Sequence, residues 1–159
     1  MSGRARRYVR RVAQRTESSV SVDAPPSEVL AVLVDLEAYP TWAGGVTEVV
    51  VLDTDEAGRP ATARLTMSSG PVRDSLLVGY DWTVTTTGTG TVSWSLVEPG
   101  RVTSTMDGSY ELVAEGAGTR VTYRLEVDVT ITMPGLLRRK AEKVITDAAL
   151  KDLKKRVER

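Results

Sequence analysis

The sequence predicts one α+β domain, in which a curved antiparallel sheet of six to seven strands, two short helices and a long C-terminal helix enclose a cavity. Short segments of alternating polar and apolar residues recur along the chain, and turns rich in glycine and proline separate them. One long helical pattern then closes the chain, at residues 136–157. The length of 159 residues fits a single core.

A short strand and a helix come first. Residues 18–23 alternate between polar and apolar, which predicts a half-buried strand. Prolines followed by Glu28 are typical of the first turn of a helix, and apolar residues then recur at helical spacing to about residue 37. We expect the segment 39–42 to break this helix and two glycines to lead into the next strand.

Six further strands are predicted, at residues 46–53, 61–68, 72–85, 91–98, 102–114 and 120–132. The short connections between them make consecutive strands antiparallel neighbours. Residues 121–131 alternate so regularly that the odd positions must face a core and the even positions water. One face of the sheet is therefore expected to be covered and the other wet.

The final helix provides the cover. Its apolar stripe is expected to comprise Leu137, Ala141, Val144, Ile145, Ala148, Ala149 and Leu153. The wet side is expected to carry most of Arg138, Lys140, Glu142, Lys151, Asp152 and Lys155. A lone helix with small residues in its stripe cannot fill a strongly curved concave face, so we expect a cavity beneath it.

Two residue types are absent, and their absence excludes several kinds of site. The chain has no histidine and no cysteine. A Ser-His-Asp triad, a disulfide framework and a zinc-thiolate site are therefore excluded. The acidic residues Asp53, Asp55 and Glu56 fall in a turn that lacks the ligand spacing of a known calcium loop. We expect neither a metal nor a cofactor.

Charge is balanced overall but concentrated at the start. Six arginines and no acidic residue lie among the first fifteen residues, which leaves 15 basic (21 − 6) and 21 acidic groups in the rest. We interpret residues 1–16 as a disordered, solvated arm and residues 17–159 as the domain. The start has no apolar stretch typical of a secretory signal, and no apolar run is long enough to span a membrane. We expect a cytoplasmic monomer or weak dimer without nucleic-acid partners or stable membrane insertion.

Five stretches carry a resemblance to a known family: APPSEV at 24–29, DLEAYPTW at 35–42, VSWSL at 92–96, MDGSYEL at 106–112 and GTRVTY at 118–123. Their order and spacing over about residues 17–157 resemble the START-like (Bet v 1-like) superfamily with its helix-grip fold. More narrowly, they resemble the polyketide cyclase/dehydrase and lipid-transport (SRPBCC) group. The resemblance implies an internal cavity for a hydrophobic small molecule such as a lipid, a polyketide or an isoprenoid.

Strand alternation and the helix stripe together assign the lining of this cavity. The expected lining residues are Leu65, Met67, Leu76, Val78, Tyr80, Trp82, Trp94, Leu96, Ser104, Met106, Gly108, Tyr110, Tyr123, Leu125, Leu137, Ala141 and Val144. Trp, Tyr and Met among aliphatic side chains suit a flat or flexible apolar ligand with a few polar atoms. For any single residue the alternative is ordinary core packing.

Binding and transport of such a ligand is the function that we predict, and two alternatives stay open. The resemblance to cyclases implies an arginine inside the pocket, but alternation places Arg64 and Arg73 outward, and Arg101 and Arg120 fall at turns. Asp74 has inward parity and is interpreted as a charge at the cavity rim. A polyketide cyclase or dehydratase with unknown catalytic residues is the first alternative. The second is an interaction module that docks through the basic arm.

Overall fold

The structure is a computed structural model that describes residues 15–69 and 72–159. Its elements are β1 (Thr16–Val22), α2 (Pro26–Val34), the 3₁₀ helix η1 (Leu36–Thr41), β2 (Val46–Thr54), β3 (Pro60–Ser69), β4 (Val72–Val84), β5 (Gly90–Leu96), β6 (Thr103–Glu115), β7 (Gly118–Val129) and α3 (Gly135–Val157). The predicted bounds agree with these to within a few residues. Of the predicted arm 1–16, only Arg15 and Thr16 are described, and Thr16 begins β1.

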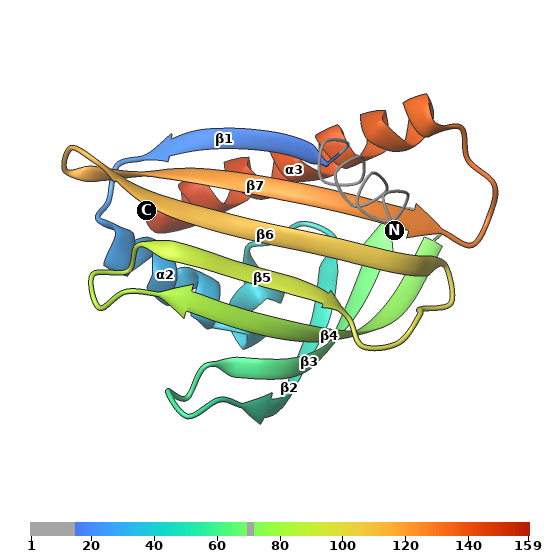
Figure 1. Cartoon of the computed structure of the whole chain (residues 1–159), viewed down its shortest axis with the longest axis horizontal. Helices are drawn as coiled ribbons and strands as arrows, with labels where there is room; N and C mark the ends of the chain where they lie inside the picture. The colour runs from blue at the N-terminus through green and yellow to red at the C-terminus, as the bar shows by residue number, and fades with distance from the viewer. Residues whose placement is uncertain (1–14, 70–71) are drawn as a thin grey trace, which may run out of the picture.

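The seven strands form one antiparallel sheet in the order β1-β7-β6-β5-β4-β3-β2. Strands β2 to β7 are therefore neighbours in chain order, and β1 returns to pair with β7 at the opposite edge from β2. The sheet curves, and α2 and α3 lie on the same face of it (Figure 1). The predicted fold class is confirmed: a curved antiparallel sheet is covered by a long C-terminal helix.

Strand register determines which side chains share the covered face. Tyr110 on β6 lies opposite Tyr123 on β7, and Trp94 on β5 lies opposite Gly108 on β6. Trp94 also lies opposite Tyr80 on β4. Residues directly opposite each other in an antiparallel pair point to the same face. These residues therefore share the face that alternation predicted for them.

The contacts of α3 correct the predicted helix stripe. Glu142, Thr146, Leu150 and Leu153 are its buried residues. Leu153 agrees with the prediction and Ala149 is half-buried, but Glu142, expected on the wet side, is only 3% exposed. The expected stripe residues that are exposed instead are Leu137, Ala141, Val144, Ile145 and Ala148.

Polar groups on β1 and β7 explain this orientation of α3. The Glu142 carboxylate accepts hydrogen bonds from Thr16 Oγ1 and from the backbone N–H of Val127, both at 2.7 Å. Thr146 Oγ1 lies 3.0 Å from Ser18 Oγ, with which it shares a buried hydrogen bond. A buried polar group is expensive unless it is bonded, so α3 turns its polar residues toward these partners.

Asp74, at the start of β4, holds the loop before β6. It is buried, and its carboxylate accepts backbone N–H bonds from Arg101 (3.0 Å), Val102 (3.0 Å) and Thr103 (2.8 Å), as well as from Ser75 (3.0 Å). Asp74, interpreted from the sequence as a charge at the cavity rim, is thus tied into the fold by these bonds. Its carboxylate has a structural task, which is to satisfy four backbone donors.

We expect Asp74→Asn to destabilise the protein by about 1–3 kcal/mol at pH 7, because an amide cannot accept on both sides. Burial raises the pKa of the Asp74 carboxyl. The hydrogen bonds from the backbone N–H groups of Thr103, Val102 and Arg101 together lower it by more, so the pKa lies below its ordinary value. A depressed pKa means that the stabilisation is complete above the unfolded pKa of about 4 and is lost as the pH falls through the folded pKa.

Urea unfolding of both proteins at several pH values from 7 down to 2 checks this. The difference in free energy of unfolding should shrink as the pH falls. A difference of the same size at pH 7 and pH 2 would contradict a role for the ionised carboxylate.

Candidate functional site

Aromatic side chains gather between the sheet and the helices. We call this group the aromatic cluster; it comprises Tyr39, Trp42, Tyr80, Trp82, Trp94, Tyr110 and Tyr123. Strands β4 to β7 supply five members, and η1 and the residue after it supply the other two. All three tryptophans of the chain belong to it. The alternation of the strands thus brings residues far apart in sequence onto one covered surface.

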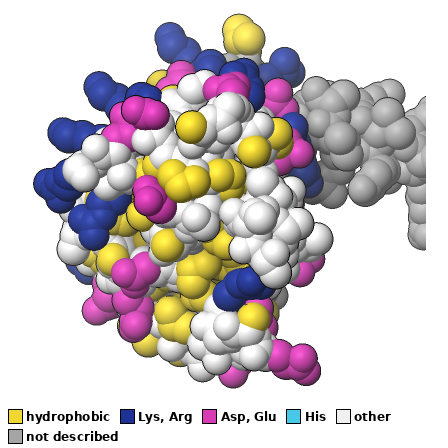
Figure 2. Space-filling view, turned by 90° about the vertical axis from the view of Figure 1, so that its left-hand side faces the viewer, with side chains coloured by type: hydrophobic (Ala, Val, Ile, Leu, Met, Phe, Trp, Pro, Cys, Tyr) yellow, Lys and Arg dark blue, Asp and Glu magenta, His cyan; other side chains and the backbone are white. Residues whose placement is uncertain are grey.

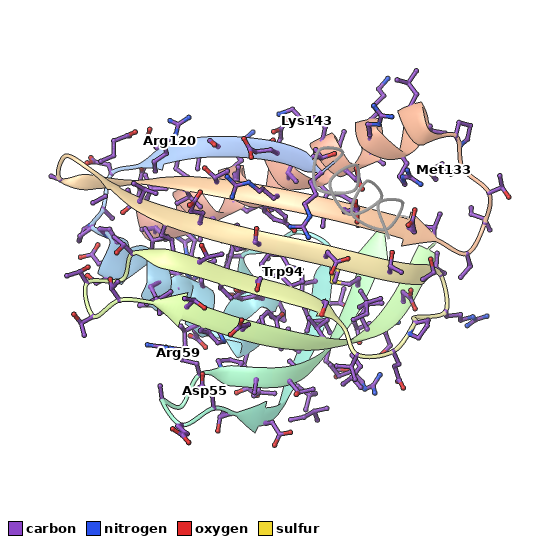
Figure 3. The ribbon with its side chains drawn as sticks, in the orientation of Figure 1. Asp55, Arg59, Trp94, Arg120, Met133 and Lys143 are labelled. Atoms are coloured by element: carbon purple, nitrogen blue, oxygen red, sulfur yellow. The ribbon has the colours of Figure 1, made fainter. Side chains whose placement is uncertain are left out.

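Trp94 is the centre of the cluster. Its ring centroid lies 5.3 Å from that of Tyr110, 5.6 Å from that of Tyr123 and 6.2 Å from that of Tyr80. The rings of Tyr110 and Tyr123 meet edge to face at 4.6 Å. Figure 3 shows Trp94 near the middle of the sheet. Such contacts hold the rings in place, so their polar atoms have defined positions.

The polar atoms of the cluster fall into two groups. Tyr39 donates its hydroxyl to the Leu33 carbonyl at 2.6 Å, and Trp82 donates its indole N–H to the Pro60 carbonyl at 2.7 Å. The hydroxyls of Tyr80, Tyr110 and Tyr123 make no hydrogen bond within the described residues. They are three free donors beside an apolar surface.

These three hydroxyls contact space that water can enter. Among the described residues, no buried side-chain nitrogen or oxygen is both sealed from solvent and without a hydrogen-bond partner. Tyr110 and Tyr123 are each only 7% exposed as whole residues. The small exposed part of each residue therefore includes its hydroxyl.

Burial keeps the tyrosines of the cluster protonated. Loss of hydration raises the pKa of Tyr80 and Tyr123 far above that of an exposed phenol, and it is the largest cause for Tyr39 and Tyr110 as well. The other tyrosine hydroxyls and the Asp152 carboxylate raise the pKa of Tyr110 further. These hydroxyls are therefore protonated at neutral pH, so each can donate a hydrogen bond and none is a base.

The predicted lining residues occupy three different environments. Leu65, Leu76, Val78 and Leu125 are buried in packed core. Half-buried residues that share the covered face are Met67, Tyr80, Trp82, Trp94, Leu96 and Met106. The helix residues Leu137, Ala141 and Val144 are exposed. These six half-buried residues, together with the buried Tyr110 and Tyr123, form the best candidate for a ligand-contacting surface.

Two predicted lining residues have other surroundings. Gly108 is buried against Trp94: a Cβ there would lie 2.6 Å from the indole Nε1 and still closer to Cε2 and Cζ2. Ser104 lies at a register shift of β6 between Thr103 and Thr105, where alternation no longer fixes the direction of a side chain. Gly108 therefore serves the aromatic cluster by leaving room for a ring.

Sequence reasoning missed three residues near the site. Tyr39 and Trp42 were interpreted only as a helix break, yet their rings pack edge to face at 4.9 Å and belong to the cluster. Asp152 was expected on the wet side of the helix, but it is half-buried and accepts a hydrogen bond from the Gly44 N–H at 3.0 Å. The sequence signal that could have identified this segment as part of the site was the pair of aromatic residues on either side of Pro40, Tyr39 and Trp42.

A cleft lies away from the cluster, and none of the cluster's residues lines it. It is a cleft of about 420 Å³ beside the Asp74 loop, lined by Thr66, Arg73, Asp74, Ser75, Pro99, Gly100 and Arg101. Asp74 is already occupied by backbone donors, and Arg73 and Arg101 are exposed. The polar wall of this cleft is thus structural, and the aromatic cluster remains the stronger candidate.

Apolar surface reaches the outside at one end of the molecule. Seen from the end at which α2 and the C-terminus lie, apolar side chains gather in the middle and charged ones lie mostly around them (Figure 2).

In the described part of the chain, no group of three or more acidic side chains is placed to hold a metal ion. None of the described helices is long and apolar enough to cross a bilayer.

Comparison of the sequence with family profiles gives one match. The profile described as polyketide cyclase / dehydrase and lipid transport matches residues 13–158. No curated protein sequence matches the chain.

Solved structures with the same fold include proteins of different activities. A START superfamily protein from Mycobacterium smegmatis superimposes with a TM-score of 0.82 at 21% identity, over 91% of this chain and 97% of that one. The Zhui aromatase/cyclase from a Streptomyces species gives 0.74 at 16% identity, over 91% and 93%. A STAR-related lipid transfer protein from Xanthomonas axonopodis gives 0.75 at 20% identity, over 90% and 85%.

Proposed function

Because the chain belongs to the polyketide cyclase/dehydrase and lipid-transport family, we propose that it binds and carries a hydrophobic small molecule against its aromatic cluster. The observation that supports this most is the set of three tyrosine hydroxyls that have no partner in the described residues and contact solvent-accessible space. Buried donors are normally bonded, so a site that leaves three free is suited to a ligand that supplies the partners.

The chemistry of the cluster favours carriage over catalysis. Its tyrosines have raised pKa values, so none is a base at neutral pH. The nearby carboxylates have structural partners: Asp152 accepts from Gly44, and Glu142 accepts from Thr16 and Val127. A carrier needs none of these groups to titrate.

Nile red, an uncharged apolar dye, should bind and quench the intrinsic fluorescence, because all three tryptophans lie in the cluster. Met106→Lys should weaken binding at least about tenfold, because an unpaired charge in an apolar site is expensive. Val113→Lys is the matched control on the other face of β6, where Val113 is exposed.

Fluorescence titration gives the affinities, and circular dichroism shows that each variant is folded. Absence of Nile red binding to the parent protein, or equal loss in both variants, would contradict the proposed site. Turnover of a polyketide-like substrate that Tyr110→Phe abolishes without weakening its binding would instead favour a cyclase.

A further inference from the structure

We infer that the ligand is uncharged where it meets the cluster and carries a neutral acceptor oxygen, which one or two of the hydroxyls of Tyr80, Tyr110 and Tyr123 bind. This inference rests on the proposed function and specifies the chemical class of its ligand: an apolar body with a ketone, ester, ether or similar neutral oxygen. Free fatty acids are excluded as preferred ligands.

The direction of the available hydrogen bonds is the first argument. A protonated phenol can donate one hydrogen bond, and the three hydroxyls have no acceptor within the described residues. Tyr110 and Tyr123 contribute from adjacent strands with their rings in contact, so their hydroxyls belong to one small region. A hydrocarbon has no lone pair and cannot accept from them.

The charges around the cluster are the second argument. Within the described residues, no lysine or arginine acts on the pKa of these tyrosines, whereas Asp152 raises the pKa of Tyr110 and Asp35 that of Tyr39. A carboxylate ligand would lie in a largely buried site, with no counter-ion among the described residues and near the negative charge of Asp152. Such a ligand would have to lose its hydration without compensation.

Tyr39 supplies a comparison inside the same cluster. Its hydroxyl donates to the Leu33 carbonyl at 2.6 Å and is thereby occupied. Tyr39 therefore ties α2 to η1, while the other three donors are left for a ligand. Removal of its hydroxyl should affect stability, and removal of the Tyr110 or Tyr123 hydroxyl should affect ligand choice.

Three naphthalenes test this on the full-length protein: 2-acetylnaphthalene, 2-ethylnaphthalene and 2-naphthoate. Isothermal titration calorimetry at pH 7.5 gives the affinities. The ketone should bind about fivefold more tightly than the hydrocarbon, as one good neutral hydrogen bond allows, and at least about tenfold more tightly than the carboxylate. Equal binding of the ketone and the carboxylate overturns the inference.

The hydrocarbon separates this inference from the proposed function. Equal affinity for 2-ethylnaphthalene and 2-acetylnaphthalene overturns the role of the hydroxyls but leaves an apolar binding site. Failure of all three compounds to bind overturns the proposed function and the inference with it.

Tyr110→Phe and Tyr123→Phe should each reduce the preference for the ketone by about two- to fivefold and leave the affinity for the hydrocarbon unchanged. Their melting temperatures should stay near that of the parent, because neither hydroxyl has a protein partner in the described residues. Tyr39→Phe is the matched control: its melting temperature should fall and its preference should stay. An equal loss of preference in Tyr39→Phe overturns the assignment.

Discussion

A chain that ends at Met133, and so lacks α3, should not unfold cooperatively. Leu150 and Leu153 of α3 are buried in the core that also contains Val121 and Leu125 of β7. At about 1.5–3 kcal/mol for each fully buried leucine, their loss alone removes about 3–6 kcal/mol. The free energy of unfolding of a domain of this size is about 5–15 kcal/mol in total. In addition, β1 and β7 would lose their hydrogen-bond partners on α3. Urea unfolding followed by circular dichroism measures the effect.

Two single substitutions control for the truncation. Leu153→Ala removes a side chain that is 0% exposed and should cost about 2–5 kcal/mol. Leu136→Ala changes a residue of the same helix that is 81% exposed and should leave stability within about 0.5 kcal/mol. A truncated chain that melts cooperatively near the temperature of the parent, or equal effects of the two substitutions, would contradict the packing of α3.

Gly108→Val should displace Trp94 and abolish ligand binding. Even a Cβ at this position would lie well inside contact distance of the indole ring, and the branched side chain adds two further carbons. Overpacking of this kind costs about 1–3 kcal/mol, and here the displaced ring is the centre of the aromatic cluster. Nile red titration and the wavelength of tryptophan emission report binding and ring position separately.

Gly79→Ala is the matched control for Gly108. Gly79 lies on β4, and a Cβ there would meet only Val97 Cγ2, at an ordinary 3.6 Å. We expect unchanged binding and nearly unchanged stability. Normal dye binding by Gly108→Val would show that the place occupied by Trp94 is not needed for the site.

Alternation within the sequence determined the covered face of the sheet. The period of two over residues 121–131 assigned Tyr123 and Leu125 inward, and both are buried. Short turns made each strand the neighbour of the next, so Tyr110 and Trp94 were assigned to the same face. These features are local, because strand geometry and turn length follow from a few adjacent residues. The fold class and five members of the aromatic cluster could therefore be predicted.

Only the tertiary structure decided the polar contacts between distant segments. The apolar stripe of α3 suggested burial of Val144, yet Glu142 and Thr146 are buried because Thr16, Ser18 and the Val127 N–H lie against them. These partners lie on β1 and β7, and they meet the helix because β1 pairs with β7 at the edge of the sheet. The periodicity of the sequence does not show that pairing.

The same holds for the two carboxylates that looked free in the sequence. Asp74 is hydrogen-bonded to the backbone of residues 101–103, and Asp152 on α3 is hydrogen-bonded to Gly44, which lies 108 residues earlier in the chain. A side chain's pattern can show which face it occupies, but its hydrogen-bond partner depends on which distant backbone the fold places beside it. For the same reason, only the tertiary structure shows that the hydroxyls of Tyr110 and Tyr123 have no hydrogen-bond partner among the described residues.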